Sequence, residues 1–165
     1  DKIKNMEKII DYKKLPTLIE LIKQENKPLV LVGGCFDILH FGHVRFLAQA
    51  KKSGTVIVAV ESDENLTKYK GVFRPIHKQP ERAEVLASLE NVDYVIPLPQ
   101  FTTHQEYFDL VQMIRPDIIA VTEGDAQMEN KQKQAESVGG KIAVIAKIKT
   151  PSTTQLAKLL RLDFD

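Results

Sequence analysis

The sequence lacks the features that mark several classes of protein. Its 165 residues contain one cysteine and no tryptophan. The single thiol, Cys35, excludes an intrachain disulfide framework and a cysteine-rich zinc site, and it is typical of a reducing compartment. No apolar run approaches the ~20 residues that span a bilayer, and the first residues lack the apolar core of a signal peptide. We therefore expect a cytoplasmic protein that does not bind membranes.

An excess of one charge is also missing. Lys and Arg number 23 and Asp and Glu number 22, which leaves a formal net charge of +1. The net charge of the chain therefore does not indicate nucleic acid as a partner. Any phosphate-binding site must be formed by a local group of residues. A chain of this length buries about two-thirds of its unfolded surface and folds without disulfides or a structural metal.

Short apolar, β-branched runs alternate with segments of helical period along most of the chain. This alternation is typical of a parallel sheet covered by helices on both faces. The expected strands are residues 29–32, 56–60, 94–96, 117–122 and 142–146. We predict a Rossmann-like three-layer α/β/α domain with a five-stranded parallel sheet. Ligands of such a domain bind beyond the carboxyl ends of the strands.

Two further segments complete the predicted organisation. An amphipathic helix precedes the first strand, so we expect an N-terminal helical extension over residues 1–28 and the main domain over 29–165. The longest irregular stretch is expected at 62–79, and a loop of that length in a compact domain is usually functional or mobile.

The first predicted strand runs into a turn that carries glycines and two histidines. Gly33 and Gly34 let the backbone approach a ligand, and the following helix start offers free N–H groups to an anion. His40 and His43 enclose Gly42, and both can donate hydrogen bonds to phosphate oxygens. An isolated pair of this spacing is more often structural. Its place at a helix start, with no cysteine or carboxylate spaced to complete a zinc site, favours phosphate over metal.

At this turn the sequence resembles a known family. Residues 34–44, G-C-F-D-I-L-H-F-G-H-V, are similar to the H-x-G-H signature of the cytidylyltransferase-like nucleotidyltransferases. Within that family they are most similar to the adenylyltransferase domains of ADP-heptose synthases. The resemblance covers roughly residues 29–160, and its further segments keep the family's order at 58–63, 70–71, 74–75, 81–82, 85–86, 92–93 and 152–154.

The resemblance implies roles for particular residues. It makes 29–165 a nucleotidyltransferase domain in which His40, His43 and Lys70 are catalytic. The implied acceptor-binding residues are Asp37 and Glu123. The implied nucleotide-binding residues are Gly34, Cys35, Phe36, Gly42, Arg74, Arg82, Thr122, Gly124, Asp125, Ser152, Thr153 and Thr154.

The residues themselves leave some of these roles open. Lys70 and Arg74, taken without the family, are ordinary solvated loop charges. Arg82 suits a phosphate contact and a structural pairing equally. Asp37 is either a turn residue or a ligand of Mg²⁺ or the acceptor. Residues 152–155, S-T-T-Q, form a predicted capping box, and the same helix start is a natural anion site.

The resemblance also implies a reaction. The acceptor of the family is a phosphate monoester, which is mostly dianionic at neutral pH and needs no general base. It attacks the α-phosphorus of an NTP in line and expels pyrophosphate, with Mg²⁺ bound mainly through the NTP.

ATP and a sugar 1-phosphate similar to heptose 1-phosphate are the expected substrates. The sequence departs from the family at Val32-Gly33, where Thr-Asn is frequent. It departs again at residues 122–126, T-E-G-D-A, where K-G-G-D-Y is usual. The alternatives are a CTP:glycerol-3-phosphate cytidylyltransferase, an FMN adenylyltransferase and a non-catalytic nucleotide-binding module. We also expect a homodimer, with an apolar surface from Val85, Leu89 and residues 94–98.

Overall fold

Five parallel strands form the sheet that the alternating pattern predicts. The computed structural model describes residues 7–160. Its strands are β1 (Leu29–Gly34), β2 (Thr55–Val60), β3 (Tyr94–Pro97), β4 (Ile118–Thr122) and β5 (Lys141–Ile145). They lie in the order β3-β2-β1-β4-β5, so the strand that leads into the glycine-histidine turn is central. The predicted Rossmann-like fold with a five-stranded parallel sheet is confirmed.

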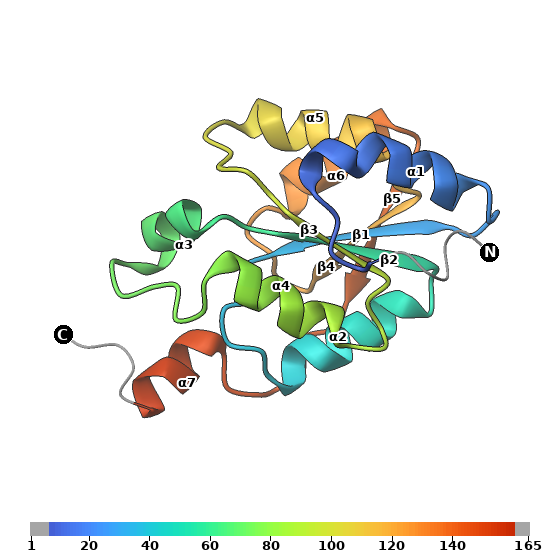
Figure 1. The fold of residues 1–165 in the computed structure, drawn as a ribbon. Helices are drawn as coiled ribbons and strands as arrows, with labels where there is room; N and C mark the ends of the chain where they lie inside the picture. The colour runs from blue at the N-terminus through green and yellow to red at the C-terminus, as the bar shows by residue number, and fades with distance from the viewer. Residues whose placement is uncertain (1–6, 161–165) are drawn as a thin grey trace.

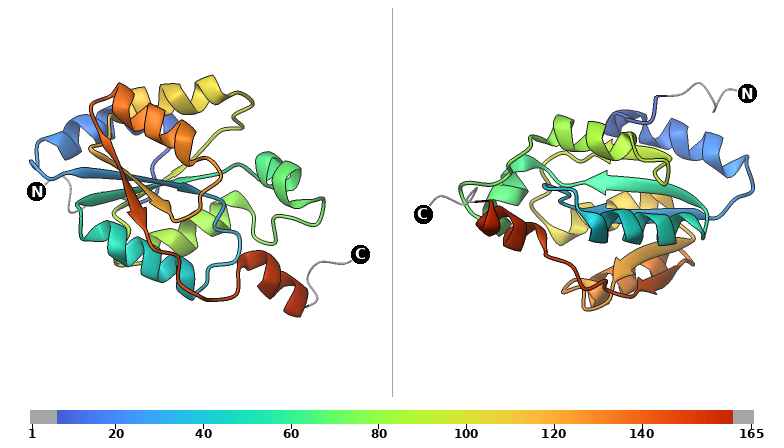
Figure 2. Two further views of the ribbon diagram at one scale, coloured as in Figure 1. Left: turned by 180° about the vertical axis from the view of Figure 1, so that it is seen from behind. Right: turned by 90° about the horizontal axis from the view of Figure 1, so that it is seen from below.

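Helices cover both faces of this sheet (Figure 1). A short 3-10 turn, Tyr12–Lys14, leads into α1 (Leu15–Lys23), which lies on one face with α5 (His104–Ile114) and α6 (Met128–Ser137). The other face carries α2 (Phe41–Lys51) and α4 (Gln79–Ala87). Two short helices, α3 (Asp63–Lys70) and α7 (Thr153–Leu159), lie at the end of the sheet where β1 and β2 finish (Figures 1 and 2).

The strands are apolar throughout because each of their two faces meets a different helical layer. Along β1, Val30 and Val32 pack toward α2 and α4, whereas Leu31 packs with α1 and α5. All six residues of β2 are buried. A parallel sheet that is covered on both sides requires such continuous apolar strands, which is why the runs could be recognised in the sequence.

The N-terminal segment belongs to the same core as the sheet. On α1 the apolar face is buried, with Leu18 only 1% exposed. Ahead of this helix, the Ile10 amide donates to the Val95 carbonyl at 2.9 Å, and the Val95 amide donates to the Lys8 carbonyl at 2.8 Å. Residues 8–10 thus extend the hydrogen bonding of β3, at the edge of the sheet. The predicted extension over 1–28 is, in its described part, built into the main domain.

One expectation about the middle of the chain is wrong. The stretch 62–79 is not irregular throughout, because α3 occupies Asp63–Lys70. Its start is capped by Ser62, whose hydroxyl accepts from the Asn65 amide at 3.2 Å. This helix buries only Asn65 and Leu66, so it has almost no apolar period for a sequence pattern to reveal.

The surface expected for a homodimer also differs. Residues 94–98 are mostly buried within the monomer, under α4 on one face and α1 and α5 on the other. They cannot supply an exposed apolar patch. Val85 is exposed, and Leu89 is partly buried against the core. The homodimer stays a prediction without this surface.

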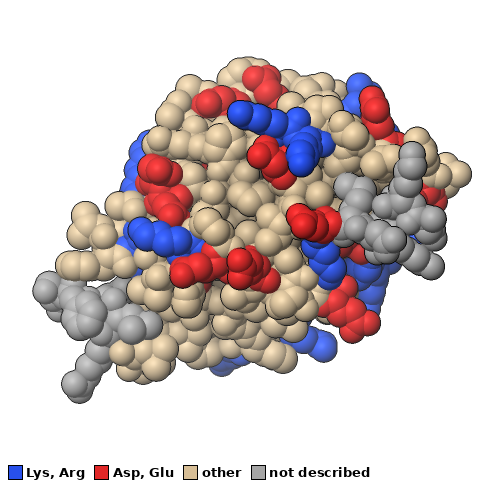
Figure 3. Space-filling view, viewed as in Figure 1, with Lys and Arg blue, Asp and Glu red and all other residues tan. Residues whose placement is uncertain are grey.

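Charges of both signs are mixed on the surface. Figure 3 shows acidic and basic side chains interspersed over the described part of one face, with no broad field of one sign. Across residues 7–160, none of the helices combines the length and apolar character needed to cross a membrane.

The packing of α1 predicts a stability effect. Leu18→Ala should lower the free energy of unfolding by about 2–5 kcal/mol, because it leaves a cavity in the shared core. Chemical denaturation measures this, with Lys23→Ala, which changes an exposed residue on the same helix, as the control. A loss below about 1 kcal/mol for Leu18→Ala would mean that α1 is only loosely attached.

Candidate active site

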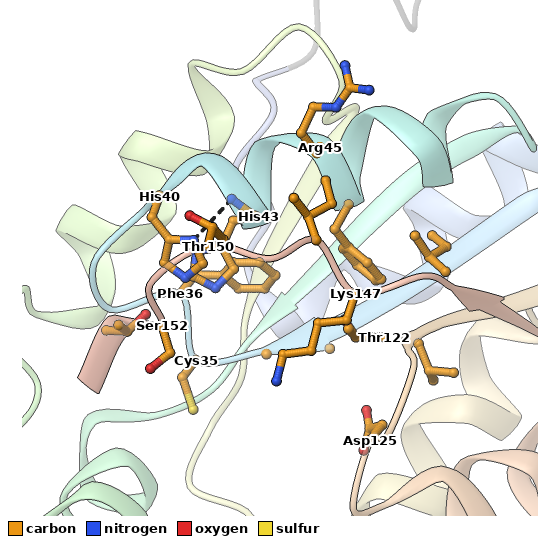
Figure 4. A pocket seen from close by; sticks show the side chains of 18 of the residues that line it. Cys35, Phe36, His40, His43, Arg45, Thr122, Asp125, Lys147, Thr150 and Ser152 are labelled. Atoms are coloured by element: carbon orange, nitrogen blue, oxygen red, sulfur yellow. Dashed lines mark hydrogen bonds between the residues drawn. The ribbon is translucent and has the colours of Figure 1, made fainter. Parts of the chain in front are cut away.

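A cavity of about 670 Å³ lies at the carboxyl ends of β1, β4 and β5. Its volume is within the ~300–1,000 Å³ typical of small-molecule sites. The glycine-histidine turn forms one side, and the end of β4 and the linker between β5 and α7 form the others (Figure 4). Most of the residues singled out from the sequence line it: Gly33, Gly34, Cys35, Phe36, Asp37, His40, Gly42, His43, Lys70, Arg74, Thr122, Asp125, Ser152, Thr153 and Thr154.

His40 is held at the start of α2 by its own side chain. It is the N-cap residue, and its Nδ1 accepts a hydrogen bond from the Gly42 amide at 3.1 Å, drawn as a dashed line in Figure 4. Since Nδ1 accepts, the neutral ring carries its proton on Nε2. His40 can therefore donate from Nε2 to an anion at the helix start, where unpaired backbone N–H groups also point.

Gly42 has no room for a side chain. A Cβ at this position would stand 2.9 Å from the Cε1 atom of His40 and 3.0 Å from the Cγ2 atom of Thr150. Packing thus requires the glycine between the two histidines, because it lets the His40 ring and the linker between β5 and α7 contact the first turn of α2.

His43 lies under His40 in a more apolar setting. The two rings stack with centroids 3.8 Å apart, and the ring of Phe36 lies 5.1 Å from that of His43. Among the described residues, its buried Nδ1 has no hydrogen-bond partner, so Nε2 is the ring nitrogen left to contact a ligand. Desolvation, helped by the neighbouring His40, lowers the pKa of His43 to about 4.

The histidine pair is therefore neutral at physiological pH. Burial also lowers the pKa of His40 below its ordinary value. Neutral rings donate hydrogen bonds to phosphate but add no positive charge to the site. Positive charge in the ligand-free cavity therefore comes from its lysine and arginine side chains.

The start of α7, near the C-terminal end of the chain, lies at the same cavity. Ser152 and Gln155 form the predicted capping box, with the Ser152 amide donating to the Gln155 Oε1 at 2.7 Å and the Gln155 amide to the Ser152 Oγ at 3.3 Å. The hydroxyl of Thr153 donates to the Ile38 carbonyl at 3.3 Å. This bond joins α7 to the turn between β1 and α2. Two helix starts, those of α2 and α7, consequently border one cavity.

Asp37 and Arg74 form a buried ion pair. The Arg74 Nε donates to the Asp37 Oδ2, while the Asp37 Oδ1 accepts from the amides of Ile76 at 2.8 Å and His77 at 3.0 Å. Both carboxylate oxygens of Asp37 are thereby engaged by the protein. Of the two roles considered for Asp37, the geometry supports the structural one, in which it ties the segment after α3 to the histidine turn.

Arg82 also forms its hydrogen bonds within the protein. Its buried guanidinium donates to the carbonyls of Cys35, Glu61 and His77 and to the carboxylate of Asp63. It is 1% exposed and, among the described residues, is not part of the cavity lining. The structural alternative for Arg82 is the one that these contacts support.

The β4 end of the site is only partly as expected. Thr122 and Asp125 line the cavity, whereas Glu123 and Gly124 are exposed and lie outside its lining. Asp125 accepts from the Gln127 amide and from the Nζ of Lys131, each at 2.7 Å. Its carboxylate is thus neutralised by a residue of α6.

Several cavity residues were not anticipated from the sequence. Lys131 lies on α6, a polar helix in which only Ala135 is buried, so no periodicity identified it. The others come from the outer side of α2 and from β5 and its linker, and no local motif marks them: Arg45, Phe46, Gln49, Val144, Lys147, Ile148 and Thr150. Figure 4 shows the side chain of Lys147 extending into the cavity, whereas that of Arg45 points away from it.

A metal-binding cluster is not evident. Within residues 7–160, no group of three or more His, Cys, Asp or Glu side chains is arranged to hold a metal ion. The two carboxylates that line the cavity, Asp37 and Asp125, are each paired with a cation of the protein.

A neutral histidine pair between two helix starts, in a cleft beyond parallel strands, defines a nucleotide-binding α/β protein of the H-x-G-H type. Comparison with known proteins identifies its family. A family model described as Cytidylyltransferase-like matches residues 31–158.

Curated relatives match almost the whole chain. The Bifunctional protein HldE of a Nitratiruptor species is 36% identical over 154 residues, which are 93% of this chain and 32% of that protein. The Bifunctional protein HldE of Pectobacterium atrosepticum is 36% identical over 156 residues, with the same coverage. The chain thus spans about a third of the length of these relatives.

Solved structures agree on the fold. The lipopolysaccharide core biosynthesis protein from Thermoplasma volcanium GSS1 has a TM-score of 0.59 and 25% identity, over 74% of this chain and 98% of that one. Pantoate-beta-alanine ligase from Francisella tularensis has a TM-score of 0.64 and 20% identity, over 88% and 69%, and is similar in fold alone. The chain belongs to the cytidylyltransferase-like family and is a nucleotidyltransferase.

The contacts of Arg82 predict a loss of stability. Arg82→Met should lower the free energy of unfolding by about 3–5 kcal/mol, because it leaves Asp63 and three carbonyls without their donor. Denaturant titration measures this, and Arg45→Met, at an exposed position of α2, should change little. Near-normal stability combined with weakened nucleotide binding would instead make Arg82 a ligand contact.

The lowered pKa of His43 predicts a pH dependence of stability. Above the ordinary pKa of 6.5, His43 is neutral in the folded and the unfolded chain. Between pH 6.5 and about 4 the unfolded chain takes up a proton that the folded one excludes, so stability falls as the pH falls.

His43→Gln should therefore flatten the decline of the melting temperature over this range. His104→Gln, at an exposed histidine, serves as the control. An unchanged slope in His43→Gln would show that His43 protonates freely in the folded protein.

Proposed function

We propose that the protein transfers AMP from ATP to a sugar 1-phosphate similar to heptose 1-phosphate and releases pyrophosphate. The observation that carries this proposal is the pair His40 and His43, capped, stacked and neutral, between the starts of α2 and α7. Such a site offers hydrogen-bond donors to phosphate oxygens without acting as an acid or a base at neutral pH.

The reaction needs positioning and charge neutralisation more than proton transfer. An oxygen of the acceptor's dianionic phosphate attacks the α-phosphorus of ATP, and the bond from that phosphorus to the bridging oxygen of pyrophosphate breaks. No proton has to be removed from the nucleophile. His40 and His43 donate to oxygens that gain charge in the transition state. Lys70, at the exposed end of α3, neutralises the polyphosphate.

The cavity lining supports further nucleotide contacts. Backbone N–H groups at the start of α2 and the hydroxyls of Ser152 and Thr154 would donate to the phosphates. Thr153, whose hydroxyl donates to the Ile38 carbonyl, would offer its backbone N–H. Thr122 and Asp125 lie at the end of β4, on the side where a base or an acceptor would sit. Arg74 contributes through its pair with Asp37, which fixes the segment after α3.

Mg²⁺ fits this site as a partner of the nucleotide. Since Asp37 and Asp125 are occupied by Arg74 and Lys131, the ion would be held mainly by triphosphate oxygens and water. Bound there, Mg²⁺ neutralises charge on the phosphates and stabilises the leaving pyrophosphate.

The choice of substrates rests on sequence similarity. The resemblance to ADP-heptose synthase adenylyltransferases and the match to the two Bifunctional HldE proteins support ATP and a sugar phosphate. The similarity to the lipopolysaccharide core biosynthesis protein of Thermoplasma volcanium GSS1 also supports a sugar substrate. The unpaired thiol of Cys35 supports a reducing, cytoplasmic setting.

Substrate pairing is tested by pyrophosphate release. The protein is incubated with Mg²⁺, each of the four NTPs and a panel of heptose 1-phosphate, other sugar 1-phosphates, glycerol 3-phosphate and FMN. We expect ATP with a sugar 1-phosphate to exceed the other pairings. CTP with glycerol 3-phosphate, or ATP with FMN alone, would move the assignment to those reactions. Nucleotide binding without any turnover would indicate a non-catalytic module.

The His43→Ala variant is the internal control of this assay. Turnover should drop about 10²-fold or more, the loss typical of one transition-state donor, while circular dichroism shows an intact fold. A folded variant with near-normal turnover would remove His43 from the mechanism.

A further inference from the structure

A network of polar side chains joins α3 to α5 beside the active-site cavity. Glu61 follows β2, Asn65 lies in the first turn of α3, and Tyr107 lies on α5. The Tyr107 hydroxyl donates to the Glu61 Oε2 at 2.6 Å, and the Asn65 Nδ2 donates to the Glu61 Oε1 at 3.0 Å. The same amide group donates to the Phe101 carbonyl at 2.8 Å and to the Tyr107 hydroxyl at 3.2 Å. These bonds hold α3 against α5 and the loop before it.

The protonation state of each member suits the network. Burial, helped by the hydrogen bond to the Glu61 carboxylate, raises the pKa of Tyr107 above its ordinary value, so the hydroxyl keeps the proton that it donates. Asn65 is 2% exposed and supplies N–H donors where water has little access. Hydrogen bonds to a carboxylate are stronger than those between neutral groups. The network therefore fixes the relative positions of the segments that it joins.

The helix α3 depends on such polar contacts because it buries little apolar surface. Of its eight residues, Asn65 and Leu66 are the buried ones. Its first residue, Asp63, forms an ion pair with Arg82 at 2.8 Å. Leu66 and Lys70, which are four residues apart and share one side of the helix, both line the cavity. The place of Lys70 in the cavity thus follows from the place of α3.

We propose that the network of Glu61, Asn65 and Tyr107 positions α3 and, through Lys70, sets the affinity of the cavity for a nucleotide. The inference rests on the proposed function of the site, which makes the anionic ligand a nucleoside triphosphate. None of the three side chains belongs to the described lining of the cavity, so they are positioning residues. Without the network, α3 is in place for only part of the time, and the apparent affinity falls by that fraction.

Tyr107→Phe tests the network with a small change. It removes the hydroxyl and keeps the ring that packs edge to face on Phe101. Hydrogen–deuterium exchange should become faster for the amides of residues 63–70 and stay unchanged in α1 and α2. Calorimetry with Mg²⁺ and an ATP analogue that has a methylene bridge between the α- and β-phosphorus atoms should show about 3- to 10-fold weaker binding, as expected if α3 is in place for about 10–30% of the time.

Tyr12→Phe is the matched control. Tyr12 also packs edge to face on Phe101, with ring centroids 5.9 Å apart, and it lies outside the network. This variant should match the wild type in both measurements. Equal effects of the two variants would indicate a general disturbance of the aromatic packing and contradict the proposal.

A double-mutant cycle tests whether the effect passes through Lys70. Lys70→Ala should weaken binding of the analogue, and Tyr107→Phe should then cause no further loss. A merely structural role of Tyr107 would lower the stability and leave the affinity of the folded protein unchanged. Additive losses, or a Lys70→Ala variant that binds the analogue as the wild type does, would contradict the proposal.

The remaining outcomes separate the network from the proposed reaction. Unchanged exchange in α3, or unchanged affinity despite faster exchange, would contradict the role of the network. If the acceptor panel shows no turnover while binding of the analogue still depends on Tyr107, the proposed reaction fails and the network stands. Turnover with ATP at the wild-type KM in Tyr107→Phe would keep the reaction and overturn the network.

Discussion

One buried guanidinium, that of Arg82, joins the segments that make up the site. It donates to the backbone at the ends of β1 and β2, to the loop before α4 and to the first residue of α3. These segments are far apart in sequence and meet at one end of the sheet. Because buried carbonyls need donors, one side chain with several N–H groups in fixed geometry can hold all of them. The position of the histidine turn relative to α3 depends on this interaction.

The charge of the site is distributed in a similar way. The carboxylates of Asp37 and Asp125 would repel a triphosphate, but Arg74 and Lys131 neutralise them within the protein. The half-buried histidines have lowered pKa values, which keeps their rings neutral near neutral pH. Among the described residues of the cavity lining, Lys70 and Lys147 are the lysines for which the structure gives no ion pair or hydrogen bond. The division follows from burial: groups that are removed from water are paired or neutral, and charges that meet the ligand stay exposed until it binds.

The parts of the fold predicted from the sequence are those with a repeating apolar signal. The five strands are continuous apolar runs because both faces of the sheet are covered, and α1 and α5 have clear apolar faces. Polar helices gave no such signal. The Ser62 cap, the ion pair of Asp63 with Arg82 and two buried residues hold α3. The ion pairs of Lys131 and Lys133 and the buried Ala135 hold α6. Residues 94–98 were expected at a surface because their apolar character was the only information that the sequence offered. In the structure, the segment before α1 and the helices on both faces of the sheet cover them.

The turn on which the site is built could be predicted from the chain alone. Glycines, two histidines and a helix start are neighbours in sequence, so their arrangement follows from local geometry and the space available at Gly42. The start of α7 is equally local, since Ser152 and Gln155 form a capping box. Which charged residues are free for a ligand depended instead on the tertiary structure. Arg82 and Asp37 are engaged by backbone groups and partners far away in sequence. Lys147 enters the cavity of the histidines because strand order, which no local pattern encodes, brings the ends of β5 and β1 to one edge of the sheet.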